Sequence, residues 1–195
     1  YMYGYADYNA TGSVNGIELS QTGAPDLITN SNTGSEAIVL EGITENSSSA
    51  SNSWGFYTHF SVIQNTSSGT VHIKGKGAKN AGVTIAADGA VLAQSGKIIL
   101  EGLGYGSTTQ NAIRIEGVVG QKAGSGVTSS SAAIELIGDK LAILGSLPNG
   151  RIASSGQLTI RPRTPSTTIG IGGATGTLQL SSSYFSTNFV NGFSK

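Results

Sequence analysis

The chain repeats one short pattern of hydrophobic and polar positions from end to end. An apolar residue, any residue and a second apolar residue follow one another, and a charged residue and a glycine often come next. The clearer copies begin at Ile38, Val71, Ile98, Ile113 and Ile134, and the weaker ones at Ile17, Val83, Leu158, Ile169 and Leu178. Alternation with a period of two is typical of β-strands that bury one face. The pattern therefore predicts short strands separated by polar loops of variable length.

Each predicted strand divides into a buried face and an exposed face. Ile38 and Leu40 share the predicted buried face, and Val39 and Glu41 share the other. The same division along the chain predicts a core ladder of Ile38, Leu40, Val71, Ile73, Ile98, Leu100, Ile113, Ile115, Ile134, Leu136, Leu158, Ile160, Leu178 and Leu180. The glycine after a strand, such as Gly42, predicts a change of direction or a positive φ, because a residue with a Cβ resists that backbone.

The spacing of the copies favours a solenoid. The interval is 21 residues from Ile113 to Ile134 and 20 from Leu158 to Leu178. Roughly nine coils of about 20 to 24 residues, each with two or three strands, would stack equivalent strands in parallel about 4.8 Å apart. We therefore predict an all-β fold, a parallel β-helix (solenoid) with irregular loops. An antiparallel β-sandwich or a β-prism stays the alternative, with turn signals every 8 to 12 residues or so.

We predict one β-helical domain over residues 1–195. Residues 1–69 are less regular, residues 70–181 form regular coils, and residues 182–195 are an excursion that leads to a further coil. We expect a fragment of a much longer chain, because Phe193, Ser194 and Lys195 would lead into another strand.

The composition narrows the classes of partner. Only 11% of residues are charged, the net charge is zero, and the chain contains 29 glycines and no cysteine. Nucleic acids require a basic surface, so we predict no nucleic-acid partner. No apolar stretch approaches the roughly 20 residues of a membrane-spanning helix, so we predict no membrane span. Disulfides and thiolate metal sites are excluded by the absence of cysteine.

One part of the sequence resembles a family of large bacterial exoproteins. The segments Gln157–Pro162, Thr168–Ala174 and Gly176–Ser181, followed by the Asn191–Ser194 turn, resemble stretches of filamentous-haemagglutinin-like two-partner-secretion proteins and related autotransporter adhesins. The likeness is specific over residues 157–195 and diffuse over residues 70–156. The Asn-Pro-Asn-Gly motifs of the family's secretion domain have only a near relative here, the predicted turn Leu147–Gly150.

The resemblance implies a right-handed β-helical shaft that is exported through an outer-membrane transporter. It also implies a role in adhesion, aggregation or biofilm, so the expected location is secreted or on the bacterial cell surface, associated with the outer membrane. The expected partners are glycans or proteins on host or neighbouring cells, and further copies of the chain in a fibre. Our leading hypothesis is therefore a structural shaft and not an enzyme.

A polysaccharide lyase or hydrolase is one alternative, because glycoside hydrolysis uses two carboxylates facing one cleft. The candidate carboxylates at or beside strand ends are Glu41, Glu101, Glu116 and Glu135. All fall on the predicted solvent side, with Lys74 and Arg114 in comparable positions, so surface ion pairs are the simpler interpretation. The two histidines, His59 and His72, lack accompanying ligands, and we predict no metal and no cofactor; a lone surface calcium ion stays open.

Aromatic residues provide the other alternative, a glycan-binding module. Trp54, Phe56, Tyr57, His59 and Phe60 lie within seven residues, and flat side chains can stack on the apolar faces of sugar rings. Strict alternation places Trp54 and Phe56 on one face, and Tyr57 and His59 on the other. These four residues are the candidate contacts for a glycan or a protein partner, although aromatic cover for a coil end also explains them. A later cluster is expected to pack down on the shaft; it comprises Tyr184, Phe185, Phe189 and Phe193.

Overall fold

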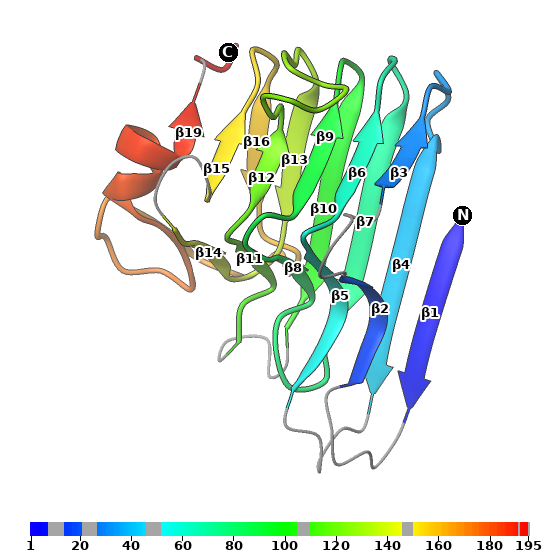
Figure 1. The fold of residues 1–195 in the computed structure, drawn as a ribbon. Coiled ribbons are helices and arrows are strands. Elements are labelled where there is room, and N and C mark those ends of the chain that lie inside the picture. The colour runs from blue at the N-terminus through cyan, green and yellow to red at the C-terminus, as the bar shows by residue number, and fades with distance from the viewer. Residues whose placement is uncertain are drawn as a thin grey trace.

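The computed structural model shows an all-β protein whose strands form three main parallel sheets (Figure 1). It describes residues 1–7, 14–20, 27–45, 52–104, 110–145, 150–190 and 192–194. Sheet A contains, in order, β1 (Met2–Asp7), β4 (Ile38–Glu45), β7 (Thr70–Lys76), β10 (Lys97–Leu103), β13 (Ala133–Ile137) and β16 (Leu158–Arg161). Sheet B contains β2 (Val14–Ser20), β5 (Ser53–His59), β8 (Val83–Ile85), β11 (Ile113–Ile115) and β14 (Leu141–Ile143).

Sheet C completes the set with β3 (Leu27–Asn30), β6 (Val62–Asn65), β9 (Ala90–Ala93), β12 (Val118–Gly120), β15 (Arg151–Ala153) and β19 (Phe189–Val190). A separate pair, β17 (Ile169–Ile171) and β18 (Leu178–Leu180), and the short helix η1 (Tyr184–Asn188) lie between β16 and β19 in the sequence. The predicted excursion after residue 181 thus contains a helical turn before the chain returns to sheet C.

From β1 to β16, successive strands enter sheets A, B and C in turn. We call each set of three consecutive strands a tier; the described residues contain five complete tiers, from β1–β3 to β13–β15. Strands of neighbouring tiers pair in parallel in all three sheets, as in β4 with β7 and β11 with β14. The predictions of an all-β chain and of parallel pairing are therefore confirmed.

The predicted coil length of about 20 to 24 residues is wrong for most of the chain. In sheet A, Ile98 pairs with Ile134, 36 residues later, and Ile134 pairs with Leu158, 24 residues later. The 21-residue interval from Ile113 to Ile134 joins strands of different sheets, because β11 belongs to sheet B and β13 to sheet A. Three strands and their loops need more residues than the shortest intervals between repeat copies suggested. The described residues therefore contain five complete tiers, where about nine coils were predicted.

The core lies between the three sheets and is built from aliphatic side chains in register. Leu40, Ile73, Leu100, Leu136 and Ile160 pair in succession along sheet A. Of the fourteen residues of the predicted ladder, twelve are buried, and Leu158 and Ile160 pack against the same core while partly exposed. The partial exposure of these two follows from their place in β16, which is the last strand of sheet A.

Three of the glycines that follow the core positions do not turn the chain, so the prediction is wrong for them, whereas Gly117 lies at a bend between β11 and β12. Gly42, Gly75 and Gly102 lie inside β4, β7 and β10, and they pair with one another across sheet A. A Cβ on Gly75 would lie 2.0 Å from the carbonyl oxygen of Gly82, at the start of the sheet B strand β8. These positions require glycine because the backbones of sheets A and B approach closely there.

The loop before β13 packs against sheet C. The side chain of Val127 is fully buried against Ala90, Leu92 and Val118, so the loop before β13 covers part of the outer face of sheet C.

Of the predicted turn Leu147–Gly150, only Gly150 is described, with a φ of 62°. Asn191 of the second predicted turn also lies outside the described residues. Among the described residues, no helix has the length and apolar character needed to cross a membrane.

Candidate functional site: an aromatic row on sheet B

An aromatic row lies on β5, in the outer face of sheet B. It consists of Trp54, Tyr57 and His59, all half-buried. The ring centroids of Trp54 and Tyr57 are 4.9 Å apart, and those of Tyr57 and His59 are 6.3 Å apart. Phe60 extends the contact, with its ring centroid 3.9 Å from that of His59. The rings are tilted relative to one another, by 39° between Trp54 and Tyr57 and by 63° between Tyr57 and His59, so the row presents apolar ring surface with polar edges.

The predicted division of these residues between two faces is wrong in one respect. Phe56 is fully buried in the core, and it does not share a face with Trp54. Gly55 and Phe56 are both buried, so the inside-outside alternation shifts by one residue between them. A Cβ on Gly55 would lie 2.2 Å from the backbone nitrogen of Lys76, which requires glycine at this point. The shift brings Trp54 next to Tyr57, and the glycine within the strand was the signal that could have revealed it.

Charged side chains from neighbouring strands flank the row. Tyr57 is in register with Glu18 of β2 and Thr84 of β8, and Thr84 is in register with Arg114 of β11. The Arg114 guanidinium donates to the Glu116 carboxylate, with Nε 3.0 Å from Oε1. Burial and the nearby carboxylates of Glu18 and Glu116 raise the pKa of Tyr57 above its ordinary value, and Arg114 opposes this only in part.

The outer face of sheet A carries the other predicted carboxylates. Glu41, Lys74 and Glu101 are in register on β4, β7 and β10, and they line a shallow groove of about 140 Å³ together with Arg163. Arg163 Nε lies 3.5 Å from the Glu101 carboxylate. The groove runs over the glycines of sheet A, which also line it.

Two cationic side chains lower the pKa of one of these carboxylates, that of Glu135. Glu135 lies between Lys97 and Arg161, and hydrogen bonds from Lys97 and then Arg161 lower the pKa of Glu135. Glu101 and Glu116, the residues of the enzymatic alternative, belong to different sheets: Glu101 is in β10 of sheet A, and Glu116 follows β11 of sheet B.

The histidines are also placed apart from each other. His72 lies on β7 with Nε2 3.6 Å from the Glu101 carboxylate, and burial and the Lys74 charge lower the pKa of His72. His59 belongs to the aromatic row on sheet B. In the part of the chain that the structure describes, no three metal-ligating side chains of the His, Cys, Asp and Glu types form a group.

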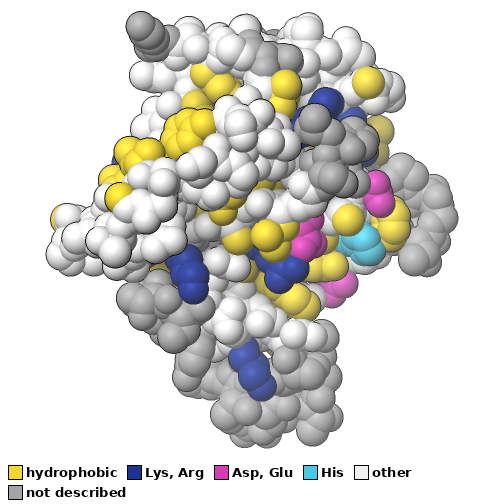
Figure 2. All heavy atoms as spheres, turned by 90° about the vertical axis from the view of Figure 1, so that its left-hand side faces the viewer, with side chains coloured by type: hydrophobic (Ala, Val, Ile, Leu, Met, Phe, Trp, Pro, Cys, Tyr) yellow, Lys and Arg dark blue, Asp and Glu magenta, His cyan; other side chains and the backbone are white. Residues whose placement is uncertain are grey.

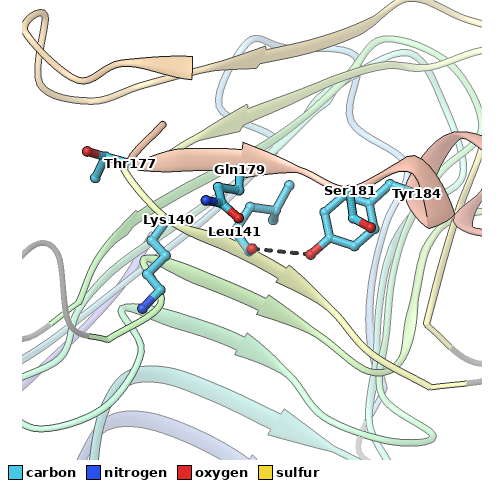
Figure 3. A pocket seen from close by; sticks show the side chains of 6 residues that line it. All are labelled: Lys140, Leu141, Thr177, Gln179, Ser181 and Tyr184. Atoms are coloured by element: carbon cyan, nitrogen blue, oxygen red, sulfur yellow. Dashed lines mark hydrogen bonds between the residues drawn. The ribbon is translucent and has the colours of Figure 1, made fainter. Parts of the chain in front are cut away.

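A pocket at the last strands was not predicted from the sequence. A pocket of about 540 Å³ lies between β14 and β18, and Lys140, Gln179 and Tyr184 are among its lining residues (Figure 3). Sequence reasoning placed Tyr184 against the shaft, and it is buried against the main core. Lys140 and Gln179 carried no local motif, because their proximity arises only when the last strands stack.

Comparisons of the chain with protein-family models, with curated proteins and with solved structures found no match. The likeness to filamentous-haemagglutinin-like exoproteins over residues 157–195 therefore stays a hypothesis.

Proposed function

We propose that the three sheets wind into a right-handed parallel β-helix and that the chain is part of the structural shaft of a secreted or cell-surface bacterial adhesin. The observation that carries this proposal is parallel, in-register pairing between neighbouring tiers in all three sheets. Connections between parallel strands of one sheet are right-handed in nearly all proteins, which supports the handedness. Such a stack gives each tier neighbours on both sides and one continuous core.

The surface is consistent with a structural shaft whose stability does not depend on charged side chains. Few side chains are charged, and Figure 2 shows an end of the molecule, on the side of η1 and β14, on which uncharged polar atoms and backbone predominate. The stability of such a stack depends on aliphatic packing and strand hydrogen bonds, both of which respond weakly to salt. A shaft exposed to varying surroundings benefits from that insensitivity.

Single-molecule force spectroscopy tests the shaft. Pulling on the two ends is expected to release the chain in several steps, one for each tier, and each step should lengthen the chain by on the order of 100 Å. Release of the whole chain in a single step of roughly 700 Å would contradict the proposal.

A cross-link between tiers provides the matched control. Lys97 and Ala133 are in register on β10 and β13, and both are partly exposed. Cysteines at both positions, joined by a cleavable bismaleimide, should remove one step from the unfolding trace. Cleavage of the linker should restore that step, and an unchanged trace with the linker intact would count against stacked tiers.

Glycan binding by the aromatic row is the second candidate function. The contact between Trp54 and Tyr57, with Glu18 and Arg114 on either side, combines a stacking surface with groups that hydrogen-bond to sugar hydroxyls. A glycan array should show ligands whose affinity falls about tenfold in Trp54→Ala, as expected for the loss of one aromatic stacking contact. Tyr3→Ala, which removes an exposed tyrosine from sheet A, should bind as the wild type does. Equal binding by Trp54→Ala and wild type would exclude this function.

A further inference from the structure

Among the described residues, sheet B has no strand at the point where the other two sheets continue. Sheet A extends to β16 and sheet C to β19, but sheet B ends at β14. The strand β18 has the right place in the sequence and the apolar-polar-apolar pattern of β11 and β14, and its Leu178 and Leu180 enter the main core. It nevertheless pairs with β17 and not with β14. The outer edge of β14 therefore has no strand partner in the part of the chain that the structure describes.

A tyrosine hydroxyl occupies that edge. Tyr184 Oη accepts a hydrogen bond from the backbone N–H of Ile143 at 3.2 Å and donates one to the carbonyl oxygen of Leu141 at 3.3 Å. In a parallel pair, a neighbouring strand would bond to these outward-facing groups. A group that both accepts and donates, as a hydroxyl does, thus fits the edge of β14.

The missing strand leaves the pocket between β14 and β18. Its volume of about 540 Å³ lies within the usual range of small-molecule sites, about 300–1,000 Å³. The lining residues are Lys140, Leu141, Thr177, Gln179, Ser181 and Tyr184. Figure 3 shows the polar side chains of Gln179, in β18, and of Thr177 and Ser181, directly before and after β18, on one side of the pocket, and Lys140 and Leu141 on the other.

We propose that this pocket binds a saccharide of one or two rings and favours an acidic one. The Thr177 hydroxyl and the Gln179 amide can each donate and accept hydrogen bonds, which matches a ligand rich in hydroxyl groups. The Ser181 hydroxyl already bonds to the hydroxyl and the backbone N–H of Ser183 and keeps one further hydrogen-bonding position. Lys140 supplies the charge among the six lining residues, and its positive sign favours a carboxylate on the sugar. This site is separate from the aromatic row, since β14 and β5 are not neighbours in sheet B.

A matched pair of disaccharides tests the proposal. Cellobiose and cellobiouronic acid have the same ring skeleton, and the second carries one carboxylate. Titration of the ¹⁵N-labelled protein should shift the amide resonance of Ile143, with cellobiouronic acid binding several-fold more tightly than cellobiose. The double variant Gln179→Ala/Ser181→Ala should weaken both by at least about tenfold, as expected for the loss of two polar contacts. Lys140→Gln should remove the preference for the acid.

Control variants separate this site from other sources of binding. Gln110→Ala changes an exposed glutamine outside the pocket and should leave both affinities unchanged. Trp54→Ala should also leave them unchanged, so its result distinguishes the pocket from the aromatic row. The proposal is wrong if neither disaccharide shifts Ile143 at 10 mM or so, a concentration that detects even weak, millimolar complexes. It is equally wrong if only a strand-forming peptide does so, or if Gln179→Ala/Ser181→Ala binds both sugars as the wild type does.

Discussion

The two ends of the stack differ in how far their edge strands are covered by other parts of the chain. At the first end, β1, β2 and β3 are the outermost strands of their sheets, and large apolar side chains are exposed, with Tyr1 82% and Leu27 61% accessible. At the last end, the segment from β18 to β19 folds against the core, and its Tyr184 is only 9% accessible, although Ile169 and Ile171 of β17 stay exposed. Side chains can therefore complete a sheet that has no further strand, and the first end lacks such groups among the described residues.

Three polar contacts hold the last end in place. The Tyr184 hydroxyl binds β14, and the Asn188 side-chain amide donates to the carbonyl oxygen of Gly150. The third contact centres on the buried Asp139, which accepts hydrogen bonds from the backbone N–H groups of Arg163 and Thr164 and from two threonine hydroxyls. Each contact satisfies groups that would be costly to bury without a partner.

The largest effect is expected from Tyr184→Ala. The change removes a buried ring from the core and a hydroxyl from the edge of β14, so we expect it to lower the free energy of unfolding by about 3 kcal/mol. Tyr3→Ala at the first end removes a ring that is half exposed and should cost under about 0.5 kcal/mol. Equilibrium unfolding in urea measures both. Similar losses at the two positions would show that the last end is no better packed than the first.

Asp139→Asn should have the next largest effect, about 2 kcal/mol, because an amide cannot accept all the hydrogen bonds that the buried carboxylate receives. Burial opposes ionisation of Asp139, but the hydrogen bonds from Thr164, Thr167 and Arg163 outweigh it and hold the pKa below its ordinary value. The carboxylate therefore stabilises the fold fully above the pKa of the unfolded chain, about 4. That stability is lost as the pH falls through the lower pKa of the folded state.

Unfolding measured between pH 7 and pH 2 tests this dependence. The difference in stability between wild type and Asp139→Asn should shrink as the pH falls below about 4. Glu45, at the first end, is the matched control, because Lys76 and then Tyr5 lower its pKa by hydrogen bonds in an exposed position. Glu45→Gln should unfold as the wild type does, and a loss as large as that of Asp139→Asn would remove the contrast between the ends.

Tyr184→Phe isolates the hydroxyl that completes β14. It keeps the ring and leaves the Ile143 N–H and the Leu141 carbonyl without that partner, so we expect a loss of about 1 kcal/mol. Hydrogen exchange of the Ile143 amide should become faster than in the wild type. Tyr5→Phe removes an exposed hydroxyl bond to Glu45 and should change neither quantity. An unaltered exchange rate at Ile143 in Tyr184→Phe would mean that the hydroxyl does not protect the edge.

The sequence predicted the strands and their core-facing residues well, because alternation is a local property, but Val39, on the predicted exposed face, is buried. Ile98, Ile113 and Ile134 all lie in the main core. The same local pattern could not assign strands to sheets, since Ile98 of sheet A and Ile113 of sheet B look alike in sequence. The coil length was underestimated for that reason.

For the candidate site too, the local sequence pattern did not show which residues the fold brings together. Trp54, Tyr57 and His59 were named from the sequence, but the shift at Gly55 that places Trp54 beside Tyr57 depends on how closely sheets A and B approach. The pocket at the last end joins Lys140 and Gln179, which are brought together by strand stacking and by no pattern in the sequence around either residue.

The smallest effect concerns self-association at the first end. The edge of β1 carries Tyr1, Met2, Tyr3 and Tyr5, all exposed, and an unpaired edge with apolar side chains can pair with another strand. We expect weak association of copies, detectable only at concentrations near about 1 mM. Sedimentation velocity should show it for the wild type and not for Tyr3→Lys, because a charge on the edge opposes pairing. Phe185→Lys alters an exposed ring at the last end and should associate as the wild type does; the reverse result would place the adhesive edge at the last end.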